Sequence, residues 1–205
     1  MNPIKRVVNY LLEINNAKRT PRTGWHRLGI RPAESISEHM AATAQIAYIL
    51  AQMENANAEH AAVLALFHDI GEVRTGDEDW ISRIYKNKDG AECAAFKAQI
   101  EELPMKPAIS RIFEEFKERK TKEALIAKDA DLLELAVQAK VYEESGFDGA
   151  LTCVVGIREK ITTASAKKIL SILETSHMQD WWMEIPEISR AIKSCAAPKT
   201  RRPHK

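Results

Sequence analysis

The sequence lacks any apolar run close to the roughly 20 residues that a helix needs to cross a bilayer, and its amino terminus lacks the apolar stretch of a secretory signal. Only three of its 205 residues are cysteines, far apart and outside any CxxC spacing, so neither a disulfide framework nor a zinc knuckle is indicated. The formal net charge is only +1, which excludes a strong field for nucleic acid or anionic membranes. We therefore expect a reduced, cytoplasmic protein without nucleic-acid or membrane partners.

Almost every segment carries the spacing of a helix. Apolar residues recur three to four positions apart, no run alternates with period two, and there is neither an internal repeat nor a low-complexity linker. With 45% hydrophobic and 29% charged residues, the composition suits one domain with a sizeable core. The sequence predicts an all-α fold in a single domain over residues 1–205: a core at about 7–146, C-terminal helices over 147–195 and a basic tail at 196–205.

Turn and capping residues set the expected boundaries. Residues 17–32 contain two prolines and two glycines and are predicted to be a loop. Ser35 and Glu38 have the spacing of a capping box, and the helix behind them has an apolar stripe that runs through Ile49 to Met53. The next helix is expected from about residue 58 through the His68-Asp69 pair to a glycine at 71 or 76. Further helices are predicted at about 3–16, 91–103, 108–120, 123–145, 164–175 and 186–194.

Two imidazoles and two carboxylates stand out in these segments: His39, His68, Asp69 and Asp131. Such a mixed nitrogen and oxygen set suits one divalent ion, and Mn²⁺, Co²⁺, Fe²⁺, Ni²⁺, Zn²⁺ and Mg²⁺ all stay open. Each residue alone has an ordinary explanation, because a histidine on an apolar helix face is usually a core residue and a His-Asp dipeptide is common. The joint pattern is more specific. It predicts a metal site shared by three helices.

A further carboxylate, Glu72, follows His68 by four residues and is predicted to share its helical face. Between Asp69 and Asp131 the sequence contains no histidine, which favours one metal ion over two. The charged run at 114–123 is predicted to be a solvated helix face, and Trp181-Trp182 to pack within the chain or at a dimer interface.

Four stretches carry a family resemblance: Pro21-Arg-Thr-Gly-Trp25, Glu34-Ser-Ile-Ser-Glu-His39, His68-Asp-Ile-Gly-Glu72 with Thr75-Gly-Asp77, and Lys128-Asp-Ala-Asp131. Their order resembles the signature of the HD-domain metal-dependent phosphohydrolases, and the context resembles the branch of YfbR-like 5′-deoxynucleotidases. In the bacterial enzymes of that branch an arginine and a tryptophan are adjacent, whereas Thr23-Gly24 separates them here. This departure bears on the contact of the tryptophan with the nucleotide and on selectivity for deoxyribose.

The resemblance implies roles for the candidate residues. His39, His68, Asp69 and Asp131 would bind the metal, and Glu72 would activate or position the attacking water. The catalytic Arg22 would also hold the phosphate, while Asp77 would meet the sugar. Trp25 would contact the nucleotide, and the position of Trp80 just after Asp77 makes it a candidate pocket wall. A homodimer is also implied.

The sequence thus predicts a phosphomonoesterase that removes the 5′-phosphate of (deoxy)nucleoside monophosphates. Two alternatives stay open. One is another phosphohydrolase of the same family, acting on nucleoside triphosphates or alarmones. The other is a non-catalytic helical domain that binds a metal and a nucleotide.

Overall fold

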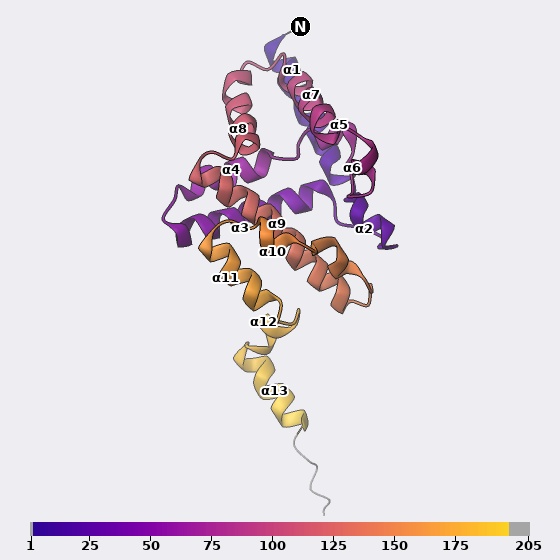
Figure 1. Ribbon diagram of the computed structural model, residues 1–205, viewed down its shortest axis with the longest axis vertical. Coiled ribbons are helices and arrows are strands. Elements are labelled where there is room, and N and C mark those ends of the chain that lie inside the picture. The colour runs from indigo at the N-terminus through magenta and orange to yellow at the C-terminus, as the bar shows by residue number, and fades with distance from the viewer. Residues whose placement is uncertain (1, 197–205) are drawn as a thin grey trace, which may run out of the picture.

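A computed structural model describes residues 2–196 of the chain, with side chains as far as Ile192. These residues form helices joined by short connections (Figure 1). Between residues 2 and 196 there is no β-strand, only an isolated antiparallel bridge between Pro21 and Ser35. The predicted all-α fold is confirmed. The predicted basic tail, apart from residue 196, lies outside the described residues.

The elements follow one another in this order: α1 (Pro3–Ile14), the 3₁₀ turn η1 (Asn15–Lys18), α2 (Thr23–Arg27), α3 (Ile36–Glu54), α4 (Ala58–Phe67), α5 (Glu72–Thr75), α6 (Ser82–Tyr85), α7 (Lys88–Ile100), α8 (Lys106–Glu118), α9 (Lys122–Glu144), the 3₁₀ turn η2 (Ala150–Val154), α10 (Ile157–Lys160), α11 (Ala164–Leu173), α12 (Asp180–Met183) and α13 (Pro186–Ala196). The predicted loop at 17–32 was wrong in part, since the second half of η1 and all of α2 lie in it. The other long helices lie within a few residues of their predicted ranges.

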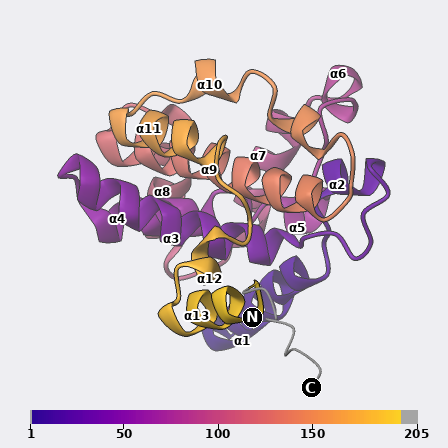
Figure 2. The same cartoon turned by 90° about the horizontal axis from the view of Figure 1, so that it is seen from below.

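Helices α3, α4 and α9 pack against one another at the centre of the molecule (Figures 1 and 2). Their contact surface is rich in alanine, with Ala47, Ala61 and Ala127 fully buried. Because small side chains let helix axes approach closely, the three backbones come near enough for side chains from different helices to meet. A second apolar cluster joins α1, α7 and α8 to the start of α3.

The start of α3 confirms the predicted capping box. Ser35 Oγ accepts a hydrogen bond from the Glu38 backbone N–H at 3.2 Å, and Glu38 Oε2 accepts one from the Ser35 N–H at 2.7 Å. The predicted apolar stripe was wrong at its far end, because Ile49 and Met53 are 55% and 48% exposed. The fully buried residues of this part of the helix are Ala47, Leu50 and Ala51, which pack in the core with residues of α4 and α9.

The C-terminal helices α12 and α13 extend away from the rest of the molecule (Figure 1). Trp181 on α12 is 69% exposed, so of the two predicted alternatives packing in the core of the chain does not hold for it, and packing at a dimer interface stays a prediction. Its ring instead makes an edge contact with Trp182. In the described part of the chain no helix is long and apolar enough to cross a membrane.

Candidate metal and nucleotide site

The His68-Asp69 pair lies in a turn at the end of α4. The helix ends at Phe67 with His68 as its C-cap, so the prediction that it continues to Gly71 or Gly76 was wrong. His68 Nδ1 lies 2.6 Å from the carbonyl oxygen of Ala65, one turn back. That hydrogen bond turns the other ring nitrogen, Nε2, away from the helix.

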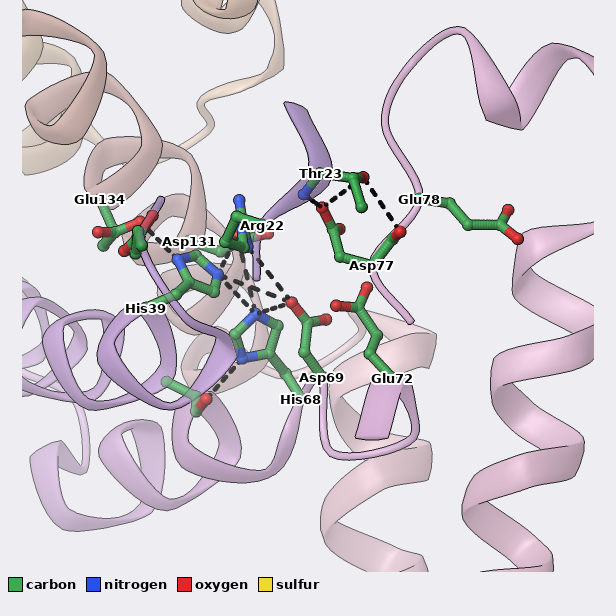
Figure 3. Close-up of polar contacts among 12 residues, drawn as sticks. Arg22, Thr23, His39, His68, Asp69, Glu72, Asp77, Glu78, Asp131 and Glu134 are labelled. Carbon is green, nitrogen blue, oxygen red and sulfur yellow. Dashed lines mark hydrogen bonds and ion pairs between the residues drawn. The ribbon is translucent and has the colours of Figure 1, made fainter. Parts of the chain in front are cut away.

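His39 and Asp131 reach the same place from two other helices, α3 and α9 (Figure 3). His39 is fully buried, as its place on the inner face predicted, and its Nδ1 lies 2.5 Å from Glu134 Oε2. Asp131 keeps 14% of its side chain exposed. It is therefore not the ordinary surface carboxylate that its sequence context also allowed.

The ring nitrogens and carboxylate oxygens of these four residues converge. His39 Nε2 lies 3.3 Å from His68 Nε2, 3.2 Å from Asp131 Oδ1 and 3.7 Å from Asp69 Oδ2. His68 Nε2 lies 3.1 Å from Asp69 Oδ2 and 3.7 Å from Asp131 Oδ1. Donor atoms about 2.1 Å from one ion lie about 3.0–3.4 Å apart at adjacent positions in octahedral or tetrahedral geometry, and about 4.2 Å apart at opposite positions of an octahedron. The spacing therefore fits a single shared ion.

The hydrogen bonds behind the two imidazoles give a second test of this fit. In each neutral ring, Nδ1–H donates to an oxygen, of Ala65 for His68 and of Glu134 for His39. Both Nε2 atoms then carry lone pairs, and these face each other and two carboxylates. Such an arrangement repels itself unless positive charge lies between the donors, as a metal ion or as a proton on one of the imidazoles. Metal-binding histidines are commonly held by this type of outer hydrogen bond.

The charges around the cluster also favour a positive charge at its centre. Burial alone would lower the pKa of the His68 imidazole, but Asp69 and Asp131 outweigh it and raise that pKa to about 10. Burial would raise the pKa of Asp131, yet Lys128 and the two imidazoles hold it well below its usual range. His39, His68 and Asp69 form a group that could hold a metal ion.

Glu72 begins the short helix α5 and lies beside Asp69 in Figure 3. The prediction that it shares a helical face with His68 was wrong, because a turn separates α4 from α5. Glu72 is wholly buried, its Oε1 pairs with the ammonium of Lys88 from α7, and its Oε2 has no hydrogen-bond partner among the described residues. Burial and the charges of Asp69 and Asp77 raise its pKa to about 8.

Gly71 makes the approach of α5 to α7 possible. A Cβ atom at this position would lie 2.8 Å from the backbone oxygen of Glu92, closer than real Cβ contacts. Since its backbone is ordinary, with φ −60°, glycine is needed here for space. This contact keeps Glu72 within reach of Lys88.

Arg22 stands at the start of α2, with its guanidinium beside the cluster. Its Nη1 lies 3.6 Å from Asp69 Oδ2, and its backbone N–H donates to the carbonyl of Glu34 at 2.8 Å. The next residue, Thr23, donates its backbone N–H to Asp77 Oδ2 at 2.7 Å. These two hydrogen bonds connect the start of α2 to the segments that contain Glu34 and Asp77. They hold Arg22 beside the metal-ligand cluster.

Arg22, His68, Asp69 and Asp131 line one cavity of about 420 Å³, whereas His39 and Glu72 lie behind its wall. This size suits a small-molecule ligand. Asp77 lies on its wall, where one carboxylate oxygen accepts from Thr23 and the other lies 3.7 Å from Lys88 Nζ. Trp80, 45% exposed, also lines the cavity and covers Gly24, where a Cβ would lie 3.4 Å from its ring. The Thr23-Gly24 segment noted above therefore lies directly against this tryptophan.

Trp25 occupies a different environment from Trp80. It forms part of the cavity wall but is only 1% exposed. Its indole N–H donates to Glu34 Oε2 at 2.9 Å, and its ring meets Tyr142 edge-on at a centroid distance of 5.1 Å. The only polar atom of Trp25 is thus directed into the protein.

A family model described as HD domain matches residues 14–170. The chain belongs to the HD-domain family. The protein named 5′-deoxynucleotidase HDDC2 from Xenopus laevis is 33% identical over 143 residues, which cover 68% of this chain and 71% of that protein. HDDC2 from Homo sapiens is 30% identical over 143 residues, covering 68% and 70%. A solved structure, a conserved hypothetical protein from Pyrococcus furiosus, is 28% identical with a TM-score of 0.71, and the match covers 82% of this chain and 99% of that one.

The structure also brings residues to this HD-domain site that the sequence reasoning missed. Cations from helices α6, α7, α8 and α10 line the cavity: Arg83, Lys88, Lys117, Arg119 and Lys160. The prediction of a solvated face at 114–123 was therefore wrong in part. Its Lys117 forms an ion pair with Glu92 at 3.1 Å, and its Phe116 packs on the His68 ring with 5.0 Å between ring centroids. The sequence gives no signal that Phe116 and Lys117 belong to the site. Their role follows from the position of α8 next to it.

Two buried carboxylates behind His39 were missed as well. Glu134 lies one helical turn beyond Asp131 on α9, a spacing that places both on one face and could have been recognised. Glu34 gives no comparable signal. Burial and the nearby Glu134 charge raise the pKa of Glu34 to about 8, and its carboxylate interacts with that of Glu134.

Replacing Arg22 tests whether its guanidinium clamps an anionic substrate. Arg22→Ala should lower kcat/KM about 100-fold, because charge-assisted hydrogen bonds contribute about 1.5–3 kcal/mol each. Arg22→Lys should recover little, since an ammonium does not form the two-pronged contact of arginine. Steady-state kinetics on a nucleoside 5′-monophosphate provides the measurement.

Arg27→Ala, at the exposed end of the same helix and paired with Asp79, is the matched control. An Arg22→Ala enzyme with normal kcat/KM would contradict the assignment.

Proposed function

We propose that this HD-domain protein is a metal-dependent phosphohydrolase that removes the 5′-phosphate of (deoxy)nucleoside monophosphates. The observation that carries the proposal is the convergence of two imidazole nitrogens and two carboxylate oxygens beside the Arg22 guanidinium. The relatives named 5′-deoxynucleotidase support the choice of substrate class.

In this proposal His39, His68, Asp69 and Asp131 hold one divalent ion. When bound, the ion supplies Lewis acidity that polarises a phosphate oxygen and lowers the pKa of water. The histidine-free interval between Asp69 and Asp131 supports one ion over two. The donor set suits Mn²⁺, Co²⁺, Fe²⁺, Ni²⁺, Zn²⁺ or Mg²⁺ and does not choose among them.

The protein residues around the cluster supply the remaining chemistry. Glu72 accepts a proton from the attacking water on its unpaired Oε2, or orients that water. Lys88 lines the cavity and pairs with Glu72. In this proposal water reaches the Glu72 carboxylate when the Lys88 side chain moves aside. Arg22 binds the phosphate oxygens and stabilises the charge that develops as the ester bond breaks.

The opposite wall of the cavity is assigned to the nucleoside. Asp77 has one carboxylate oxygen that does not accept from Thr23, and we assign that oxygen to the sugar hydroxyl. Trp80 offers an exposed aromatic face on the same wall, suited to stacking on the sugar or base. Trp25 is a third wall residue, with its indole N–H turned away from the cavity.

One substrate matrix tests the proposed function. Phosphate release from the eight ribo- and deoxyribonucleoside 5′-monophosphates should appear with at least one of Mn²⁺, Co²⁺, Mg²⁺ and Zn²⁺, and chelation should abolish it. Nucleoside triphosphates and alarmones, assayed for pyrophosphate as well as phosphate, should react more slowly. Faster turnover of a triphosphate or alarmone would favour the other phosphohydrolase alternative. Metal loading and nucleotide binding without any turnover would favour a non-catalytic domain.

Three further expectations from the sequence stay predictions. We propose a homodimer, a cytoplasmic location, and a single HD domain over residues 1–205 with its core at about 7–146. Size-exclusion chromatography with light scattering tests the first of these.

A further inference from the structure

We propose that Trp25, Glu34 and Glu134 form a buried chain of polar contacts that fixes the orientation of the His39 imidazole toward the metal. In this account Trp25 is a positioning residue for metal binding, and its main role is not contact with the nucleotide. The inference rests on the proposed function only in taking His39 as a metal ligand.

The chain runs through three connected contacts. Trp25 Nε1–H donates to Glu34 Oε2 at 2.9 Å. The carboxylates of Glu34 and Glu134 lie side by side, with one oxygen of each within 4.8 Å of the other and of a His39 ring nitrogen. Glu134 Oε2 in turn lies 2.5 Å from His39 Nδ1. Figure 3 shows Glu134 behind His39, on the side of the ring opposite His68.

Burial makes these contacts specific. Trp25 and His39 are at most 1% exposed, and the two glutamates are 8% and 4% exposed. Polar groups removed from water in this way are costly unless each has a hydrogen-bond partner. The four side chains satisfy one another, so replacing any member leaves its neighbour unpaired or free to turn.

The chain also fixes one orientation of the ring. With Nδ1 engaged by Glu134, only Nε2 of His39 faces His68 and the two aspartates. If that bond is lost, the ring can rotate about its bond to the helix, and the donor atom leaves its position. Partners of this kind typically change metal affinity 10- to 100-fold when they are removed.

The first member of the chain belongs to the segment that carries Arg22. Trp25 is three residues after Arg22 on α2, and the Arg22 backbone N–H donates to the carbonyl of Glu34 at 2.8 Å. The phosphate-binding arginine and the support of a metal ligand are therefore built on the same two segments. We therefore expect a substitution of Trp25 to lower the affinity for the metal before it affects any other property of the site.

The alternative for these residues is a second cation site, since Glu34, His39 and Glu134 have donor atoms within 4.8 Å of one another. That site would require Nδ1 of His39 to release its proton to solvent and to bind the metal through the lone pair left behind. It would add a second equivalent of bound metal, which the experiment below counts.

The test compares metal affinity in variants of the full chain without nucleotide. Trp25→Phe removes the N–H and keeps an aromatic ring, and Glu134→Gln keeps the shape of the side chain. The Co²⁺ dissociation constant, measured from the visible d–d spectrum, should rise 10- to 100-fold in both, with an altered band shape. Glu134→Asp should recover part of the affinity. Thermal unfolding of the metal-free proteins checks that each variant folds.

Trp80→Phe is the matched control, because Trp80 lines the same cavity outside the chain. It should leave the Co²⁺ dissociation constant unchanged and raise KM for the nucleotide. An unchanged constant in Trp25→Phe and Glu134→Gln would overturn the inference and leave the proposed function standing. A second bound equivalent that Glu134→Gln removes would also overturn it. Failure of the wild-type protein to bind Co²⁺ would overturn both.

Discussion

Replacing Glu72 with glutamine should lower kcat about 1,000-fold while the protein keeps its metal. Glutamine preserves the shape and burial of the side chain but does not accept a proton, and general base catalysis typically contributes 10²- to 10⁴-fold. The prediction rests on the unpaired Oε2 of Glu72 and on the charge of the nearby Asp69, which acts on the Glu72 carboxyl group. Single-turnover kinetics together with metal analysis separates loss of chemistry from loss of metal.

Glu92→Gln is the control for Glu72, since Glu92 is also a buried carboxylate paired with a lysine at this cavity. It should reduce kcat less than tenfold. If Glu72→Gln retained wild-type kcat, the attacking water would have to be activated by another group. If Glu72→Gln and Glu92→Gln lost activity equally, the loss would come from burying a neutral amide at this cavity and not from removing a general base.

Removing a proposed ligand should abolish metal binding and turnover together. Asp69→Ala deletes an oxygen that lies 3.1 Å from His68 Nε2 and 3.7 Å from His39 Nε2. Three ligands would remain, and the two imidazoles would lose a carboxylate that balances the charge of the ion. We expect less than 10% of the wild-type metal content and turnover at the background rate.

The control for this variant is Asp79→Asn. Asp79 lines the same cavity, is buried, and pairs with Arg27 at 2.7 Å, outside the ligand cluster. It should keep its metal. An Asp69→Ala protein that stays active with unchanged metal content would refute the ligand assignment.

The sequence predicted those parts of the fold and site that depend on local signals. The capping box at Ser35 set the start of α3, and the three-to-four-residue periodicity identified the helices. The burial of His39 followed from its place on the inner face of that helix. The gathering of His39, His68, Asp69 and Asp131 was predicted from the joint pattern, which no single residue would have carried.

Other parts depend on packing between distant segments and escaped prediction. No glycine or proline in the sequence marks the end of α4 at Phe67, where His68 is the C-cap. Lys88 follows Glu72 by 16 residues, and Glu134 is separated from His39 by 95. Contacts at such separations arise from the docking of α7 and α9, and periodicity within one helix does not report them.

The buried face of α3 illustrates the same limit. Periodicity selected large apolar residues such as Ile49, whereas close packing of α3, α4 and α9 buries alanines and leaves Ile49 exposed. Hydrophobicity alone ranks isoleucine above alanine for burial. The distance between helix axes decides which of them fits.

The central claim is that His39, His68, Asp69 and Asp131 hold one ion. Crystals of the protein grown with Mn²⁺ or Co²⁺ test it most directly, with anomalous diffraction measured at the absorption edge of the metal. We predict one strong peak per chain, about 2.1 Å from Nε2 of both histidines and bonded to both aspartates. A strong peak elsewhere in the chain, or none at this cluster with saturating metal, would contradict the account.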